Sequence, residues 1–183
     1  MADGTLKVGT ITTSSGSGTI TIGQSGETIT VPSGCTITNN GTQTGFGGTN
    51  TPNFLVEDSG AQSIANTTIT KLSFGTETFD SDGAFASDKF TVPSGKAGKY
   101  FFYASWQTAT STDFNEQRIY IYKNGTAIDP NIQGYHDHYG SIQISKLVDL
   151  AVSDYIEVYA YQNSGGSIDT LGTSIFSGYK IIE

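Results

Sequence analysis

Hydrophobic and polar residues alternate along most of the chain after residue 53, and this alternation is typical of β-strands. β-Branched and aromatic residues fill the alternating runs, and turn-forming residues separate one run from the next. Apolar residues at helical spacing are nearly absent. We therefore predict an all-β sandwich or jelly roll of eight or more strands. The predicted strands are Phe54–Glu57, Thr68–Phe74, Phe85–Val92, Lys99–Trp106, Gln117–Lys123, Ser141–Val148, Asp154–Gln162 and Gly172–Ile182.

Several of these predicted strands are apolar on both faces. In the run from 155 to 161, one face carries Ile156, Val158 and Ala160, and the other face carries tyrosines. An antiparallel sheet normally keeps one face polar for water, so we expect an identical subunit to cover the tyrosine side. The predicted subunit-contact residues are Tyr120, Tyr122, Tyr155, Tyr159 and Tyr161.

The first fifty residues follow a different pattern, in which the triplet Thr-Ile-Thr recurs at short intervals. Its four copies begin at residues 10, 19, 28 and 36, and turns rich in Gly, Ser or Pro separate them. This pattern predicts short strands joined by tight turns, in units that cannot bury their apolar side alone. The isoleucines and their neighbours form one predicted apolar column: Ile11, Ile20, Ile22, Ile29, Val31 and Ile37.

One narrow apolar column is too little core for a free-standing monomer. Three chains wound about a common axis would bury three columns together, which predicts a fibre-like stalk. An arm that docks on another protein is the second interpretation, and a flexible Gly/Ser/Thr linker is the third. The regular spacing of the isoleucines favours an ordered segment over the linker. Residues 43–52, rich in glycine, are then a predicted hinge.

The distribution of aromatic residues marks the boundary between the two patterns. Of the 10 Phe, 10 Tyr and 1 Trp, only Phe46 precedes residue 53. A segment without aromatic side chains buries too little apolar area to fold alone, whereas the remainder of the chain has enough. We therefore predict a repeat segment for docking or a stalk over residues 1–53 and a compact head over residues 54–183.

Charge and composition exclude several classes of function. The net charge is −8 and only nine residues are basic, so the chain is unsuited to binding nucleic acid. Cys35 is the only cysteine, which excludes an intrachain disulfide. The N-terminal residues lack the pattern of a secretory signal peptide, and no apolar run is long enough to span a membrane. We expect synthesis in the cytoplasm and no membrane insertion.

Five segments of the predicted head follow the order and spacing of a known family. They are Phe90–Pro93, Gly98–Phe102, Tyr122–Gly125, Leu150–Val158 and Phe176–Ile181. With these segments the chain resembles the C1q-like branch of the C1q/tumour-necrosis-factor jelly rolls. It departs from the family pattern in a longer gap before the Gly-x-Tyr-x-Phe segment and in Ala104, where an aromatic residue is common.

The resemblance implies a ten-strand jelly roll that assembles as a tight homotrimer and binds proteins or glycans rather than performing catalysis. A short Thr/Ser/Gly-rich segment before a C1q-like head is similar to structural proteins of tailed phages of marine and cyanobacterial hosts. Residues 2–8 have the same character.

The segment from Tyr135 to Tyr139 contains both histidines of the chain. His136 and His138 would lie on one side of an extended segment, and three chains would offer six imidazole nitrogens. This spacing allows a transition metal on a threefold axis, although an exposed polar loop flanked by Gly134 and Gly140 is the favoured interpretation. The Asp80–Gly83 segment looks like part of a calcium loop, but no later Glu completes it, so we predict a turn. No other cofactor is predicted.

No catalytic motif is present, since the chain lacks a Gly-x-Ser-x-Gly elbow, a phosphate-binding glycine loop and a His-Glu-x-x-His sequence. We predict instead that exposed loops rich in Tyr, Asn and Asp bind a ligand. The loops span residues 108–116, 129–140 and 163–169. Their candidate ligand-binding residues are Asp113, Asn115, Tyr135, Asp137, Tyr139 and Asn163.

The sequence and the resemblance together predict a trimeric phage structural protein displayed on the surface of the virion. It would be a tail-fibre or host-adhesion module, or a capsid decoration or head fibre. Its partners would be its own copies, other virion proteins through residues 1–53, and a glycan or protein of the host surface. A secreted cellular C1q-like binding protein is the alternative, and a glycan depolymerase is a third class.

Overall fold

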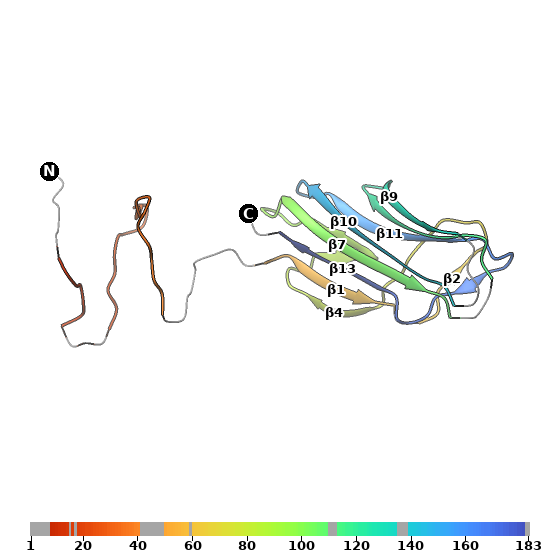
Figure 1. Ribbon diagram of the computed structural model, residues 1–183, viewed down its shortest axis with the longest axis horizontal. Helices are drawn as coiled ribbons and strands as arrows, with labels where there is room; N and C mark the ends of the chain where they lie inside the picture. The colour runs from red at the N-terminus through yellow and green to blue at the C-terminus, as the bar shows by residue number, and fades with distance from the viewer. Residues whose placement is uncertain are drawn as a thin grey trace. The chain divides into compact units, whose positions relative to one another are not determined.

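The computed structural model describes residues 8–14, 16, 18–40, 50–58, 60–109, 113–134 and 139–181 (Figure 1). The chain divides into two units, residues 1–46 and residues 47–183. The division falls inside the predicted hinge. Within the described residues, no helix has the length and apolarity needed to cross a membrane.

The described part of the first unit, residues 8–14, 16 and 18–40, contains turns and no strand. The predicted short strands are therefore absent from these residues of the single chain, which offers no neighbouring strand for their backbone groups. The predicted apolar column stays exposed, from 43% at Ile20 to 66% at Ile22. Hydrogen bonds close three turns between the triplets: Gly16 N to Thr13 O at 3.1 Å, Glu27 N to Gln24 O at 3.0 Å, and Cys35 N to Pro32 O at 3.1 Å.

The second unit contains two antiparallel sheets, which confirms the all-β prediction. One sheet has the order β10-β7-β13-β1-β4 and the other has the order β5-β6-β11-β8-β9, with β3 also paired to β11. Strands β12 and β2 form a separate pair. The strands are β1 Asn53–Glu57, β2 Ser63–Ile64, β3 Thr70–Lys71, β4 Thr76–Asp80, β5 Phe85–Ala86, β6 Lys89–Thr91, β7 Gly98–Gln107, β8 Gln117–Lys123, β9 Thr126–Gln133, β10 Ser141–Leu150, β11 Tyr155–Gln162, β12 Ile168–Asp169 and β13 Ile175–Lys180.

One predicted strand and one unpredicted strand show where backbone geometry separates the structure from the prediction. The predicted strand Phe85–Val92 is a hairpin, because Ser87 and Asp88 both have positive φ angles, 53° and 56°. Strand β9 was not predicted, since Pro130 lies in its centre. Proline is tolerated there because β9 is the edge strand of its sheet.

The hydrophobic core lies between the two sheets and is rich in aromatic rings. Phe54 of β1 stacks on Phe90 of β6 at 5.1 Å between ring centroids and meets the edge of Phe176 of β13 at 4.9 Å. Trp106 of β7 is fully buried, and its Nε1 donates a hydrogen bond of 3.1 Å to the carbonyl oxygen of Arg118 on the other sheet. These contacts join the sheets within a single chain.

Gly178 of β13 lies against this aromatic cluster. A Cβ atom at this position would lie 2.5 Å from Cδ1 of Phe102 and 2.9 Å from Cε1 of Phe54. We expect Gly178→Ala to lower the free energy of unfolding by about 2 kcal/mol, because a packed core resists an added methyl group. Gly134→Ala is the matched control, since no heavy atom lies within 4 Å of a Cβ there. Urea denaturation of both variants checks the difference, and equal stabilities would contradict it.

The hairpin between β8 and β9 has the predicted two-residue turn, Asn124-Gly125, with φ angles of 51° and 76°. Nδ2 of Asn124 donates a hydrogen bond of 2.7 Å to Asp154, and Lys123 pairs with the same carboxylate at 2.9 Å. The hydrogen bond from Asn124 and that from Lys123 lower the pKa of Asp154 to about 2.

This carboxylate gives a pH-dependent contribution to stability. Because the folded-state pKa lies below the unfolded value of about 3.9, the contribution is present above about pH 4 and is lost as the pH falls toward 2. We expect Asp154→Asn to melt at a lower temperature than the parent at pH 7, with the difference shrinking below pH 4. Calorimetry between pH 7 and pH 2.5 measures this difference, which a constant value would contradict.

The two ends of the head lie together. The N–H of Lys180 donates a hydrogen bond of 2.9 Å to the carbonyl oxygen of Pro52, and Asn53 pairs with Tyr179. Strand β7 starts beside them, since the N–H of Ile181 bonds to Lys99 at 2.8 Å, and it runs to the opposite end. We call the end at Pro52 the leader end and the other the distal end (Figure 1).

Candidate functional site

The five predicted contact tyrosines lie on the outward side of β8 and β11, and we call them the tyrosine cluster. They are Tyr120, Tyr122, Tyr155, Tyr159 and Tyr161. Tyr159 is directly opposite Tyr120, and its ring lies 4.2 Å from that of Tyr122 between centroids. Tyr120 is only 7% exposed, whereas the other four are partly exposed. The structure thus gathers the predicted residues on one face, and their role in subunit contact remains a prediction.

Charged side chains are interleaved with these rings. Lys71 of β3 donates a hydrogen bond of 2.8 Å to Glu157, whose other carboxylate oxygen accepts one of 3.4 Å from the hydroxyl of Tyr159. Burial, followed by the charge of Glu157, raises the pKa of Tyr159. Lys71 was missed from the sequence because only the pairing of β3 with β11 brings it to this face.

Arg118 fixes the distal part of the cluster. Its Nε and Nη2 donate two hydrogen bonds of 2.7 Å to the carboxylate of Glu116, and its Nη1 donates one of 3.1 Å to the hydroxyl of Tyr120. The guanidinium also lies over the ring of Tyr161, 4.8 Å from its centroid. Such a bidentate pair holds both the charge and the neighbouring rings in one arrangement.

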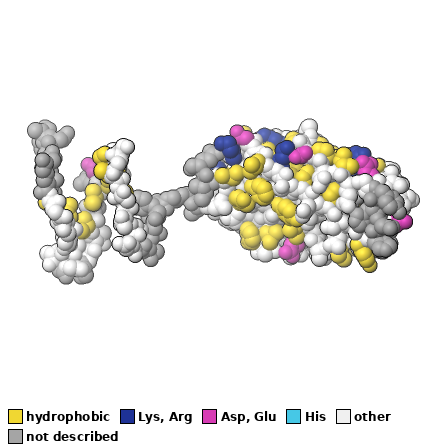
Figure 2. Space-filling model, in the orientation of Figure 1, with side chains coloured by type: hydrophobic (Ala, Val, Ile, Leu, Met, Phe, Trp, Pro, Cys, Tyr) yellow, Lys and Arg dark blue, Asp and Glu magenta, His cyan; other side chains and the backbone are white. Residues whose placement is uncertain are grey.

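The outward side of the other sheet is apolar at its centre, and we call it the apolar face. One row across the strands runs from Phe79 through Leu55 to Ser177, and a second runs from Tyr179 through Phe101 to Leu147. Leu147 is 62% exposed, Phe79 47% and Tyr179 41%. Figure 2 shows hydrophobic side chains gathered where β13, β1 and β4 lie.

The apolar face is hollowed in two places. A cavity of about 410 Å³ opens at Leu55, Phe79 and Tyr179. A second of about 500 Å³ lies at Phe101 and Leu147, near the ion pair between Lys146 and Asp129 at 2.9 Å. No charged side chain contributes to either row named above. This face was missed from the sequence because Phe79 falls in β4, which was not predicted, and because Leu147 lies on an ordinary alternating strand.

The described parts of the predicted ligand loops 108–116 and 163–169 lie together at the distal end, whereas residues 129–133 of the third predicted loop belong to strand β9. Asn115 and Asn163 are linked, because the N–H of Asn115 donates to the carbonyl oxygen of Asn163 at 3.1 Å. Thr108 donates a backbone hydrogen bond of 2.9 Å to Gly140, beside Tyr139, which is 55% exposed. Asp113 is exposed on the first of these loops. The remaining predicted residues lie outside the described residues: Tyr135, His136, Asp137 and His138.

Among the side chains that the structure describes, no three His, Cys, Asp or Glu groups lie together in a way that could hold a metal ion. The predicted metal site at His136 and His138 is outside those residues and stays untested.

The arrangement of the two sheets matches solved structures, although no family model and no curated protein matches the sequence. The globular domain of zebrafish complement 1qA protein superposes with a TM-score of 0.54 at 12% identity, over 72% of this chain and 98% of that chain. Murine APRIL at pH 5.0 superposes with a TM-score of 0.55 at 14% identity, over 70% of this chain and 98% of that chain. The second unit has the C1q/TNF jelly-roll fold.

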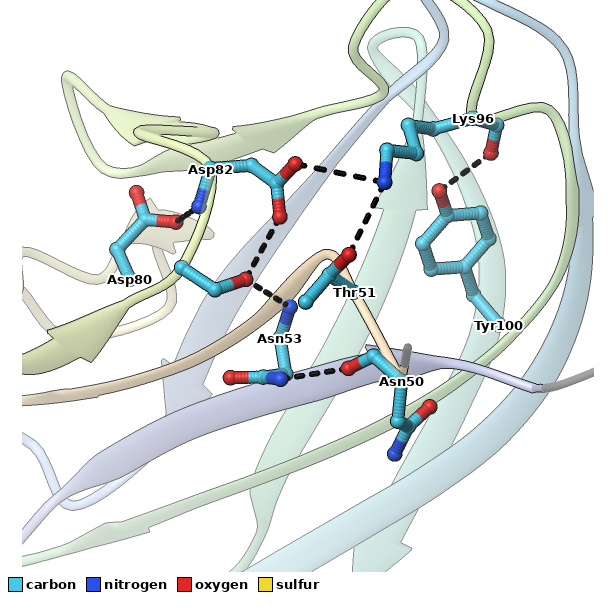
Figure 3. Close-up of polar contacts among 8 residues, drawn as sticks. Asn50, Thr51, Asn53, Asp80, Asp82, Lys96 and Tyr100 are labelled. Atoms are coloured by element: carbon cyan, nitrogen blue, oxygen red, sulfur yellow. Dashed lines mark hydrogen bonds and ion pairs between the residues drawn. The ribbon is translucent and has the colours of Figure 1, made fainter. Parts of the chain in front are cut away.

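At the leader end of the jelly roll, polar side chains tie residues 50–53 to two neighbouring turns (Figure 3). Lys96 donates a hydrogen bond of 3.0 Å to Oγ1 of Thr51 and lies 3.7 Å from a carboxylate oxygen of Asp82. The N–H of Asn53 donates to Oγ of Ser81 at 3.0 Å. These contacts hold the start of β1 against the jelly roll. Beside them, burial together with the charge of Asp82 raises the pKa of Tyr100 to about 12.

The Asp80–Gly83 segment of the jelly roll is the predicted turn. One oxygen of Asp80 accepts a hydrogen bond of 2.7 Å from the N–H of Phe85, and the other accepts one of 3.4 Å from the N–H of Asp82. Its carboxylates thus already serve the turn and the pair with Lys96.

Proposed function

We propose that the chain is a homotrimeric structural protein displayed on the surface of a phage virion. One observation carries the proposal: a jelly roll with an uncovered apolar face follows a leader whose periodic isoleucines are all exposed. Two unsatisfied apolar surfaces on one chain are both explained by a single assembly of identical copies.

The subunit contact is best accommodated by the apolar face. Contact cores are depleted of charge and enriched in aromatic side chains, as this face is at Phe79, Phe101 and Tyr179. The tyrosine cluster, which the sequence predicts for this role, contains charged pairs that a dry contact would have to desolvate. The apolar face is therefore our proposed contact.

Residues 1–53 are proposed to form a short trimeric stalk or to dock on other virion proteins. Three turns are already closed in the single chain, while the intervening triplets have no strand partner in the described residues. Glu27 is the only charged residue from 8 to 40, so three copies would meet without repulsion along most of the segment. Identical repeats of the same period provide matching apolar columns.

Binding rather than catalysis is proposed for the head. A glycan-cleaving enzyme needs two free carboxyl groups facing each other across a groove. On the tyrosine cluster, Glu157 is paired with Lys71 and Glu116 is paired with Arg118. Incubating the protein with purified host polysaccharide tests this point, because shortened chains would support a depolymerase.

Within the virion we favour a tail-fibre or host-adhesion module over a capsid decoration or head fibre. The distal loops lie at the opposite end of the head from Pro52, where the leader enters, which suits contact with a host surface. Cryo-electron microscopy of the particle tests the location. Density for the protein at the tail would support adhesion, and density on the capsid lattice would favour decoration.

A secreted cellular C1q-like binding protein is equally consistent with the jelly-roll fold. The leader favours the viral assignment, since its Thr-Ile-Thr repeat suits a stalk. The genes that neighbour the coding sequence discriminate the two: portal, capsid or tail genes support a virion protein, and chromosomal genes of a cell would contradict it.

A further inference from the structure

The tyrosine cluster forms a continuous apolar layer rather than a set of isolated rings. The ring of Tyr122 contacts two other rings of the cluster. Its centroid lies 6.1 Å from that of Tyr120 and 4.2 Å from that of Tyr159. The edge strand β9 widens this layer with Pro130, which is directly opposite Tyr120, and with Ile132, which is 52% exposed. The layer thus draws on three adjacent strands of the sheet, β11, β8 and β9.

Hydrogen-bonding groups border the layer and are already held in place. Lys71 and Glu157 flank Tyr159 on one side, and the bidentate pair of Arg118 with Glu116 flanks the distal side. A ligand that meets these groups loses little side-chain entropy of the protein, because the pairs are ordered before it arrives.

A second copy of this chain is a poor occupant of the layer. Contact with any surface of a second copy would bury the charged groups of Lys71, Glu157 and Arg118, whereas contact cores exclude charge. The apolar face carries no charge in its central rows and serves that purpose better. Assembly through the apolar face would leave the tyrosine cluster open to solvent.

We propose that the tyrosine cluster binds a neutral, pyranose-containing polysaccharide, an inference that rests on the proposed host-attachment role. The C–H faces of pyranose rings are flat and apolar enough to pack on tyrosine rings. Their hydroxyl groups exchange hydrogen bonds with ammonium, guanidinium and carboxylate groups such as those at the border. The net charge of −8 makes a polyanionic ligand unfavourable.

The test uses the full-length protein on an array of purified bacterial capsular and O-antigen polysaccharides, neutral and acidic. We expect binding to at least one neutral polysaccharide. Titration calorimetry with that polysaccharide should then show binding about tenfold weaker for Tyr122→Ala, which corresponds to a loss of about 1.4 kcal/mol for one stacked ring. Tyr122→Phe keeps the ring and should bind within about threefold of the parent. Tyr161→Ala is a second variant should the first fail to fold.

Tyr139→Ala, at an exposed tyrosine of the distal loops, tests the competing prediction that those loops bind the ligand. The control is Val152→Ala, at a 44% exposed side chain in the turn between β10 and β11, and it should leave the affinity unchanged. Loss of binding in Tyr139→Ala, with Tyr122→Ala unaffected, would overturn the inference and assign the ligand to the loops. Binding to acidic polysaccharides alone, to no polysaccharide, or to a host protein after periodate oxidation of its glycans would also overturn it.

This inference and the proposed function fail in different ways. If the protein forms a trimer on the virion but binds no polysaccharide, the proposed ligand is wrong and the proposed virion role stands. If the protein binds polysaccharide through Tyr122 but is absent from virions, the proposed virion role is wrong and the proposed binding site stands.

Discussion

Leu147→Asp is expected to convert the proposed trimer into monomers. Leu147 is 62% exposed in the single chain, so the substitution should leave the jelly roll itself intact. In the proposed assembly the same side chain is buried on the apolar face, and each contact would contain an unpaired carboxylate. We expect this to cost about 3 kcal/mol per contact, which is roughly a 100-fold loss in association. Light scattering coupled to size-exclusion chromatography at micromolar protein measures the mass.

Ile69→Asp is the matched control for Leu147→Asp. Ile69 is 46% exposed and directly precedes β3, which belongs to the other sheet, so its substitution should leave the trimer unchanged. Tyr159→Asp tests the prediction from the sequence. A monomer for Tyr159→Asp and a trimer for Leu147→Asp would return the contact to the tyrosine cluster and would remove the proposed glycan surface.

Deleting residues 1–53 should destabilise the head far more than deleting residues 1–49. The longer deletion removes the hydrogen bonds from Lys96 to Thr51 and from Lys180 to Pro52, and those between Asn53 and Ser81. With about 1 kcal/mol for each of several hydrogen bonds, we expect a difference of about 3 kcal/mol in the free energy of unfolding. Phe54, only 1% exposed, would also become the charged terminus.

Urea denaturation of the two truncated proteins, compared at equal concentration, measures this difference. The protein that starts at Asn50 should retain the trimer of the full chain, because the apolar face lies wholly within the head. Equal midpoints for the two truncations would show that the contacts in Figure 3 do not hold the start of β1. A monomeric head would instead place the trimer contact in the leader.

Most long strands could be predicted from the sequence, because the alternation of apolar and polar residues is a local property of each strand. The hairpin at Asn124-Gly125 was also predictable, since those two residues adopt positive φ readily. The hairpin at Ser87-Asp88 was not, because neither residue is a strong indicator of that turn and an apolar run continues on both sides. Pro130 concealed β9, since its tolerance depends on an edge position that only the topology defines.

The surfaces were harder to predict than the strands. The tyrosines were recognisable from alternation, but their charged neighbours were not, because Lys71 reaches them from a strand 86 residues before Glu157. The apolar face was not recognised for a similar reason. Leu55, Phe79 and Tyr179 belong to three strands that are distant in sequence and become adjacent only through pairing of β1 with β4 and β13.

The entry of Pro52 beside the exit of Lys180 has a practical consequence for engineering the molecule. A tag fused close behind Ile181 would emerge at the leader end of the head, where it would crowd residues 50–53. Gly165 and Gly166, between β11 and β12, face open space at the far tip. A short peptide inserted between those two glycines should be presented outward, which makes this loop the better position for an epitope or a fluorophore.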